Sequence, residues 1–210
     1  VGDRVVAEQI IPCNECRYCQ RGDYHMCAPH GMFGFKRKSP GAMASYMVFP
    51  TNALVHKISK AVKPWHAAYA EPLSCALHAV ERANIKFDDV VVVAGAGPIG
   101  LGMVAGARAK NPRILVVLDL DVRKLGTFVC YSVFKEEVKV DWSIISDDKE
   151  MDVLGAHLGP HCWPAAIKMI EEGKLPLDEI CTHQFPVADF QKGLDMVADG
   201  TQSIKVSLIP

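Results

Sequence analysis

Apolar and polar positions alternate in different ways along the chain. In the first 60 residues, short apolar runs bounded by glycine and proline predict strands at 3–7 and 41–49, joined by loops. Between 64 and 83 the apolar side chains recur at close to 3.6 residues, which predicts a helix. The pattern therefore places a β-rich region first and a helix after it.

The second half of the pattern is typical of an α/β region. The predicted strands at 89–94 and 113–119 are apolar except for the charged residues Asp89, Arg113 and Asp119 at their ends, as in parallel strands covered on both faces. A helix of small residues is predicted between them at 98–110. The remaining predicted elements are a strand at 126–134, amphipathic helices at 163–172 and 187–198, and a strand at 203–209. This alternation of strands and helices predicts a parallel sheet.

Composition narrows the class of protein. The 210 residues are 50% hydrophobic and 22% charged with a net charge of -1, which argues against disorder and leaves no basic excess for a nucleic-acid partner. The uncharged stretch 90–107 is long enough to be considered as a membrane span, but five glycines and a proline favour a strand, a turn and a helix. No secretory signal opens the chain. We therefore expect a cytoplasmic protein without a membrane partner.

Four cysteines form the strongest chemical motif. Cys13, Cys16, Cys19 and Cys27 lie within fifteen residues with spacings of two, two and seven. Four thiolates bind Zn²⁺ tetrahedrally and leave no open position, so the motif predicts a structural zinc site. An iron–sulfur cluster is the alternative, but its bacterial run has a fourth spacing of three followed by proline, whereas Ala28 follows Cys27.

A glycine motif follows the first apolar strand. Gly95, Gly97 and Gly100 form a G-x-G-x-x-G turn between that strand and a predicted helix. The first glycine permits the turn, the second lets the backbone approach a pyrophosphate, and the third lets helix and strand pack closely. The motif predicts a dinucleotide site, with a glycine turn that binds no ligand as the alternative.

The next predicted strand ends in an acidic residue that indicates which dinucleotide is bound. Asp119 lies nineteen residues after Gly100, near the distance at which an acid receives the ribose hydroxyls of NAD, and Asp121 is the alternative. A carboxylate repels a 2′-phosphate, so NAD is preferred over NADP despite Arg123. The predicted cofactor-binding residues are Gly95, Gly97, Pro98, Ile99, Gly100, Asp119 and Arg123.

In combination, these motifs resemble those of the zinc-dependent medium-chain dehydrogenases, and among them the polyol dehydrogenases of the sorbitol, xylitol and erythritol/threitol type. Besides the cysteines and glycines, the resemblance is carried by Gly2-Asp3-Arg4-Val5, Gly41 to Tyr46, Glu71-Pro72-Leu73-Ser74, and the tail from Phe185-Pro186 to Ile204-Lys205-Val206. The stretch from Ser132 to Gly155 is most similar to the erythritol/L-threitol type.

The resemblance implies a two-domain α/β architecture. A GroES-like β-rich catalytic domain is expected at 1–84, with its zinc lobe at 12–30. Part of a Rossmann domain, a doubly wound parallel sheet, is expected at 85–147. Residues 148–210 would end that domain and return to the catalytic one. Six strands with crossovers need about 150 residues, and only 58 lie between Asp89 and Ser146, so we expect a join near 125–126 and both domains incomplete.

The resemblance also implies the reaction. Hydride passes from a secondary alcohol of a polyol to NAD at a second, catalytic zinc. The family's Cys and Gly-His-Glu ligand motifs lie upstream of Gly2, so Glu71 alone matches the catalytic position, as a zinc ligand or as the holder of zinc-bound water. Its alternative role is that of an acid at a helix N-terminus. Cys75 is a weaker candidate that is expected to pack as a small hydrophobe.

Two hypotheses about the whole molecule remain. The first is a homo-oligomeric NAD-dependent polyol dehydrogenase, a tetramer or a dimer, of which these residues are a part. The second is a non-catalytic, truncated zinc-binding fragment of such an enzyme. In either case we expect His56, His66 and His183 on the surface or in loops.

Overall fold

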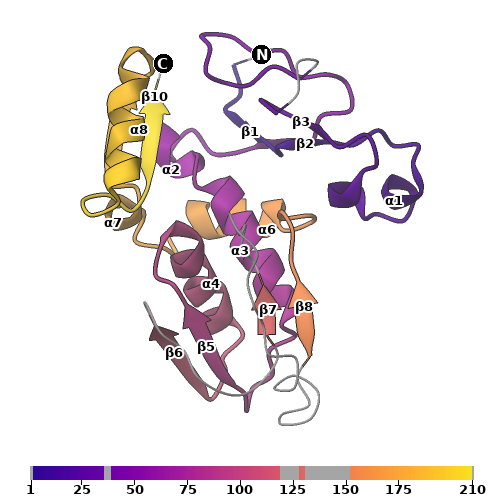
Figure 1. Ribbon diagram of the computed structural model, residues 1–210, viewed down its shortest axis with the longest axis vertical. Coiled ribbons are helices and arrows are strands. Elements are labelled where there is room, and N and C mark those ends of the chain that lie inside the picture. Colours follow the sequence, from indigo (N-terminus) through magenta and orange to yellow (C-terminus); the bar gives the residue numbers. More distant parts are fainter. Residues whose placement is uncertain (1, 36–38, 119–127, 131–151, 210) are drawn as a thin grey trace. The chain divides into compact units, whose positions relative to one another are not determined.

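The structure is a computed structural model that describes residues 2–35, 39–118, 128–130 and 152–209. The chain divides into two compact units (Figure 1). Unit 1 comprises Val1–Ser74 with Pro160–Pro210, and unit 2 comprises Cys75–Gly159. None of the described helices combines the length and the apolar character that a membrane crossing requires.

Strands of unit 1 pair in twos among its described residues. β1 (Val5–Ala7) runs antiparallel to β4 (Val55–Lys57), and β2 (Ile10–Ile11) runs antiparallel to β3 (Gly31–Met32). β9 (His183–Pro186) and β10 (Val206–Ile209) are parallel. Unit 1 thus contains strand pairs from both ends of the chain, each pair formed within one end.

Helices of unit 1 differ in how much of their surface they bury. The helical elements are α1 (Arg17–Gln20), η1 (Tyr24–Met26), α2 (Pro64–Ala67), α6 (Trp163–Glu171), α7 (Leu177–Ile180), η2 (Val187–Asp189) and α8 (Phe190–Asp199). On α6 the buried residues Trp163, Ala166, Ile167 and Ile170 follow helical spacing and form part of the core. In contrast, no residue of α1 is buried.

Helix α8 packs on the β9–β10 pair through a glycine. A Cβ on Gly193 would lie 3.3 Å from Leu208 and 3.5 Å from Phe185 and Val206. The absence of a side chain lets the helix approach the strands. The helix ends at Gly200, whose φ of +66° is the left-handed conformation that glycine adopts most readily.

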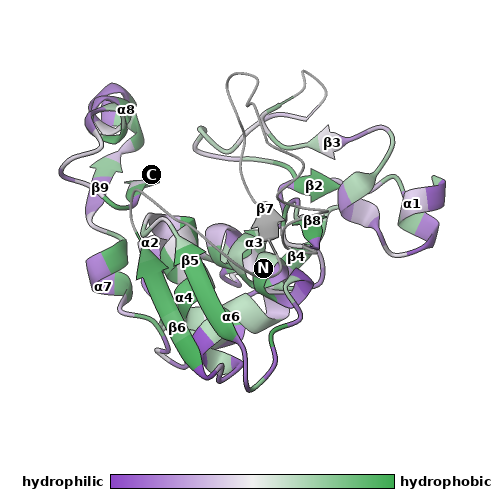
Figure 2. Ribbon diagram, turned by 60° about the horizontal axis from the view of Figure 1, so that its bottom comes forward, coloured by the Kyte–Doolittle hydropathy of each residue, from purple (hydrophilic) through white to green (hydrophobic). Residues whose placement is uncertain are grey.

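Unit 2 contains the predicted strand–turn–helix. Helix α3 (Ala70–Arg82) crosses from unit 1 into unit 2 along the chain. β5 (Val90–Ala94) leads through the glycine turn into α4 (Pro98–Ala109), and β6 (Ile114–Leu118) returns parallel to β5. β7 (Phe128–Cys130) and β8 (Val153–Gly155) form a second parallel pair. The apolar character of β5 and β6 is visible in Figure 2.

Three features differ from the sequence prediction. The predicted strand at 41–49 is not formed, because no described strand pairs with it, and Met43, Tyr46 and Val48 are 68–93% exposed. The predicted helix at 64–83 is divided into α2 and α3. In the β5–β6 pair, alternate side chains such as Val90 and Val92 are 48% and 39% exposed, so one face is not covered by described residues.

Candidate zinc and cofactor sites

The structure brings the four motif cysteines together in the lobe at 12–30. The sulfurs of Cys13, Cys16, Cys19 and Cys27 all lie within 4.8 Å of one another, and those of Cys13 and Cys19 are 4.0 Å apart. Thiolates about 2.3 Å from a tetrahedral zinc ion lie roughly 3.8 Å apart, so the cluster fits zinc closely. It is the one such group found among the described residues.

Backbone amides surround this cluster. The N–H of Cys13 donates to Cys27 Sγ and the N–H of Cys16 donates to Cys13 Sγ, both at 3.3 Å. Such bonds favour the thiolate form and orient the ligands. The described cysteines form no disulfide, which leaves these thiols available to a metal.

Two of these thiols differ in acidity. A hydrogen bond from the backbone of Ala28 lowers the pKa of Cys16 to about 6. Burial raises the pKa of Cys19 to about 12. Because a metal binds thiolates, zinc binding to this cluster would release protons from thiols of raised pKa such as Cys19.

The glycine turn has the geometry that its sequence predicts. Gly95 has a φ of +98°, and its N–H donates to Leu118 O at 2.6 Å. A Cβ on Gly100 would lie 1.9 Å from Gly95 O, so the third glycine is required for the close approach of α4 to the turn. A Cβ on Gly97 would meet nothing within 4 Å. The open space lies at the position where the motif receives a pyrophosphate.

Pro98 begins α4 directly after the N-cap Gly97, and Ile99 follows it. Proline suits the first helical position because its missing N–H would have no partner within the helix. The free amides of this helix end supply the partial positive charge that a phosphate requires. Asp119 and Arg123 lie outside the described residues.

Glu71 is half-buried in the first turn of α3. Its Oε1 accepts a hydrogen bond from Gln9 Nε2 at 2.5 Å. No described His, Cys, Asp or Glu groups with it into a metal cluster. Cys75, one position beyond unit 1 in the same helix, is fully buried. The described residues alone thus do not assemble a catalytic metal site.

Comparison with known proteins agrees with both motifs. Residues 1–60 match the alcohol dehydrogenase GroES-like domain. The chain is 57% identical to the erythritol/L-threitol dehydrogenase of Mycolicibacterium smegmatis over 265 residues, covering all of this chain and 73% of the relative. This matched length exceeds the 210 residues present, so the relative has residues without a counterpart here. The chain belongs to the zinc-dependent medium-chain alcohol and polyol dehydrogenases.

Solved structures confirm the fold of this dehydrogenase. L-idonate 5-dehydrogenase of Escherichia coli has a TM-score of 0.87 at 16% identity, with 100% of this chain and 76% of that one covered. Two others, from Escherichia coli and Sinorhizobium meliloti, were solved with NADH and NADP, at TM-scores of 0.80 and 0.82 and identities of 19% and 21%. The match to each of these two structures covers 100% of this chain and 77% of the solved chain. The α/β fold with a GroES-like and a Rossmann part is thereby established.

The dehydrogenase chain also holds a polar cluster that sequence reasoning missed. Glu8 is 3% exposed, and its Oε1 lies 2.9 Å from His56 Nε2. Tyr24 also interacts with the Glu8 carboxylate and, like His56, opposes the effect of burial on its pKa. Burial raises the pKa of Glu8. The available signal was an acid standing within the apolar run from Val5 to Ile11.

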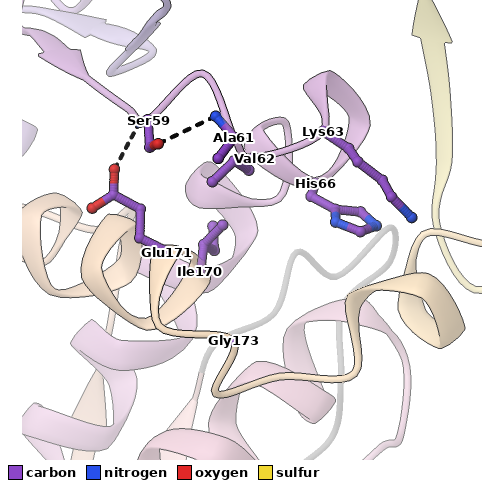
Figure 3. A pocket seen from close by; sticks show the side chains of 8 residues that line it. All are labelled: Ser59, Ala61, Val62, Lys63, His66, Ile170, Glu171 and Gly173. Carbon is purple, nitrogen blue, oxygen red and sulfur yellow. Dashed lines mark hydrogen bonds between the residues drawn. The ribbon is translucent and has the colours of Figure 1, made fainter.

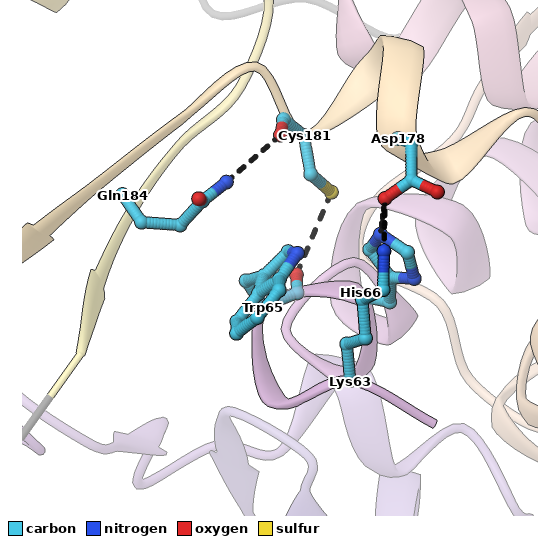
Figure 4. Close-up of polar contacts among 6 residues, drawn as sticks. All are labelled: Lys63, Trp65, His66, Asp178, Cys181 and Gln184. Carbon is cyan, nitrogen blue, oxygen red and sulfur yellow. Dashed lines mark hydrogen bonds and ion pairs between the residues drawn. The ribbon is translucent and has the colours of Figure 1, made fainter. Parts of the chain in front are cut away.

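The expectation that His56, His66 and His183 lie on the surface or in loops was wrong. His56 lies in β4 and stacks on Trp163, with ring centroids 5.7 Å apart. His66 is buried in α2 and its Nε2 lies 3.0 Å from Asp178 Oδ1 (Figure 4). His183 lies in β9 and is half-buried. Packing partners distant in sequence account for His56 and His66, and the pairing of β9 with β10 accounts for His183.

A pocket in unit 1 contains none of the predicted site residues. Figure 3 shows His66 and Lys63 on one side and Glu171 on another. Glu171 Oε1 already accepts the Ser59 N–H at 2.7 Å, and Asp178 pairs with both Lys63 and His66. Because its charged groups are engaged within the unit, this pocket is not assigned to the substrate.

Proposed function

We propose that this chain is part of an NAD-dependent and zinc-dependent polyol dehydrogenase. It would transfer hydride from a secondary alcohol of an erythritol/threitol, xylitol or sorbitol type of polyol. The observation that carries this proposal is the 57% identity to an erythritol/L-threitol dehydrogenase across the whole chain.

The four-sulfur cluster would hold one structural zinc. The geometry of Cys13, Cys16, Cys19 and Cys27 supports this assignment. Because four thiolates close the coordination shell, this metal would order the lobe and take no part in chemistry. A content of one zinc per chain, lost on substitution of these cysteines, is the expected result.

The glycine turn would bind the NAD pyrophosphate at Gly95, Gly97 and Gly100, with Pro98 and Ile99 at the helix start. Asp119 would accept the ribose hydroxyls, with Arg123 beside the same part of the cofactor. Bound NAD supplies the hydride acceptor and a catalytic zinc supplies polarisation of the alcohol oxygen. Glu71 would be a ligand of that zinc or hold its water.

The decisive experiment is binding and turnover with one preparation. Zinc content, calorimetric binding of NAD and NADP, and oxidation of erythritol, threitol, xylitol and sorbitol are measured together with the intact mass. Zinc binding, preference for NAD and polyol oxidation are expected of the complete enzyme. Preference for NADP would refute the role of Asp119, and absence of zinc would refute the lobe assignment.

The second candidate is the non-catalytic zinc-binding fragment. It is favoured by the absence of a described metal cluster at Glu71. A chain near the 23.0 kDa of the sequence that binds zinc but oxidises no polyol would establish it. A larger enzyme that carries further residues near 125–126 would instead support the internal join proposed from the sequence.

Assembly and location are extensions of the same proposal. A cytoplasmic homo-oligomer, a tetramer or a dimer, is the state that the family resemblance implies. Light scattering of the purified protein measures the oligomeric state directly, and a monomer at micromolar concentration would contradict it.

A further inference from the structure

A cluster that we call the Tyr24 clamp joins three segments of unit 1. It consists of Glu8, Tyr24, His56, His161 and Trp163. The lobe contributes Tyr24, the β-strand region contributes Glu8 and His56, and the chain just before α6 contributes His161. The motifs of the proposed function do not include any of these residues.

Tyr24 stands at the centre of the clamp. Its hydroxyl accepts the N–H of His161 at 2.9 Å and interacts with the buried Glu8 carboxylate. The ring of His161 contacts the Tyr24 ring edge-on, with centroids 5.0 Å apart. Glu8 in turn pairs with His56, whose ring stacks on Trp163 at an interplanar angle of 10°. Polar contacts thus run from the lobe to the core.

His161 depends on the lobe for its conformation. Its φ of +61° lies in the left-handed region, which is unfavourable for a residue with a side chain and persists only when surrounding contacts hold it. Two of those contacts come from the lobe, because its N–H bonds to Tyr24 and its Nε2 donates to Gly22 O at 2.9 Å. The lobe therefore holds a strained residue 137 positions away in the chain.

The lobe in turn depends on its metal ligands. Tyr24 begins η1, which ends next to Cys27, and Gly22 N–H bonds back to Cys19 O at 3.0 Å. Among residues 13–30 only Cys27 is buried. A loop with so little buried surface lacks an apolar core of its own, so its order rests on the cysteine cluster.

We propose that the Tyr24 clamp couples metal occupancy of the four-sulfur cluster to the conformation of residues 160–163. Tyr24 is a positioning residue, which acts through its contacts with His161 and Glu8 and not as a ligand. The proposal rests on the zinc assigned to the lobe under the proposed function. Coupling between two sites is reciprocal. The factor by which bound metal favours the held conformation of His161 is therefore also the factor by which that conformation raises the metal affinity.

Hydrogen exchange of the His161 amide tests one direction of the coupling. This amide is the donor to Tyr24, and Pro160 before it has no N–H. Removing zinc from the unaltered chain with a chelator is expected to speed exchange in a peptide spanning 160–163 about 10-fold. The control Tyr18→Phe, the same change on another lobe tyrosine, should show the same response. In Tyr24→Phe, exchange should be fast with zinc bound and gain little when zinc is removed.

Zinc affinity, measured by competition with a chromophoric chelator, tests the reverse direction. His161→Asn shortens the side chain beyond reach of Gly22 while asparagine tolerates the left-handed backbone. It is expected to bind zinc about 10-fold more weakly, whereas His183→Asn, outside the clamp, should bind as the unaltered chain does. This variant lies outside the lobe, so the proposal stays testable if Tyr24→Phe does not fold.

The two assignments fail in different ways. If the chain takes up no zinc on the four cysteines, both the assignment of zinc to the lobe and the coupling are contradicted. If the chain binds zinc normally but the His161 amide exchanges at the same rate with and without metal, only the coupling is contradicted. Unchanged zinc affinity in His161→Asn has the same consequence.

Discussion

The lobe at 12–30 and the strand–turn–helix at 90–109 differ in what determines their local structure. The lobe has short helices, no buried residue in α1, and four converging sulfurs. The strand–turn–helix has apolar strands and a turn in which the absence of side chains sets the geometry. Figure 2 shows the contrast in hydropathy between α1 and β5. The proposed zinc site is thus built from side chains, and the proposed cofactor site from backbone.

The largest expected effect in this comparison follows from removing one sulfur. Cys27→Ser takes away the buried ligand, 1% exposed, and should lower zinc affinity more than about 100-fold, because even residues behind the ligands contribute 10–100-fold. The lobe should then become susceptible to proteolysis. Metal analysis and limited proteolysis measure both effects.

A matched variant guards this result against a general cysteine effect. Cys181→Ser changes a buried thiol of the same unit that bonds to Trp65 O at 3.5 Å (Figure 4). It should retain one zinc per chain. If Cys27→Ser also retained its zinc, the lobe would be held by something other than the four sulfurs.

Sequence predicted both regions well because each carries its information locally. The spacing of Cys13 to Cys27 and of Gly95 to Gly100 is sufficient to recognise a ligand set and a turn. Helices such as α4 and α6 differ from their predicted bounds by one residue. The predicted strand at 41–49 failed because strands need partners, and its pattern of residues does not say whether a partner is present.

The Tyr24 clamp was beyond prediction for a related reason. Glu8, Tyr24 and His161 have no motif spacing, and they meet only once the lobe and the chain before α6 are folded. The roles of Asp119 and Arg123 stay predictions, since both lie outside the described residues. Glu71 was placed at the start of α3, but no described ligand joins it.

The second prediction concerns backbone fit. Gly100→Ala would place a Cβ 1.9 Å from Gly95 O, and the resulting rearrangement should destabilise unit 2 by about 1–3 kcal/mol. Gly97→Ala meets nothing within 4 Å at an ordinary φ of -70°, so folding should be unaffected. Urea unfolding measures this difference.

Cofactor binding then separates the two glycines further. Gly97→Ala should weaken NAD binding about 10-fold, equivalent to about 1.4 kcal/mol, because its methyl group enters the space proposed for the pyrophosphate. A stable Gly97→Ala chain that binds NAD normally would show that the turn is structural only.

The third prediction uses the buried carboxylate that supports the lobe. Burial raises the pKa of Glu8 above its ordinary value of 4.5. Between 4.5 and the raised pKa the folded chain keeps a proton that the unfolded chain has lost, so this group makes stability fall as pH rises through that window. Glu8→Gln should remove this contribution to the slope.

Urea unfolding at a series of pH values from 4.5 to 7 measures that slope. Glu15→Gln, an exposed position in the lobe, is the matched control and should retain it. The difference between the slopes of the two variants separates the contribution of Glu8 from that of other titrating groups. Equal slopes in the two variants would show that burial of Glu8 does not perturb its titration.

The smallest expected effect tests whether charge around the sulfurs matters. Arg21 pairs with Asp23 at 2.9 Å, and the two side chains are 61% and 47% exposed. Exposed pairs of this kind contribute little because water and salt screen them. Arg21→Gln should therefore change zinc affinity less than about two-fold at physiological salt. A ten-fold loss that disappears at high salt would show that cations near the cluster help to hold the thiolates. The lobe would then depend on its surface charge as well as on the geometry of its ligands.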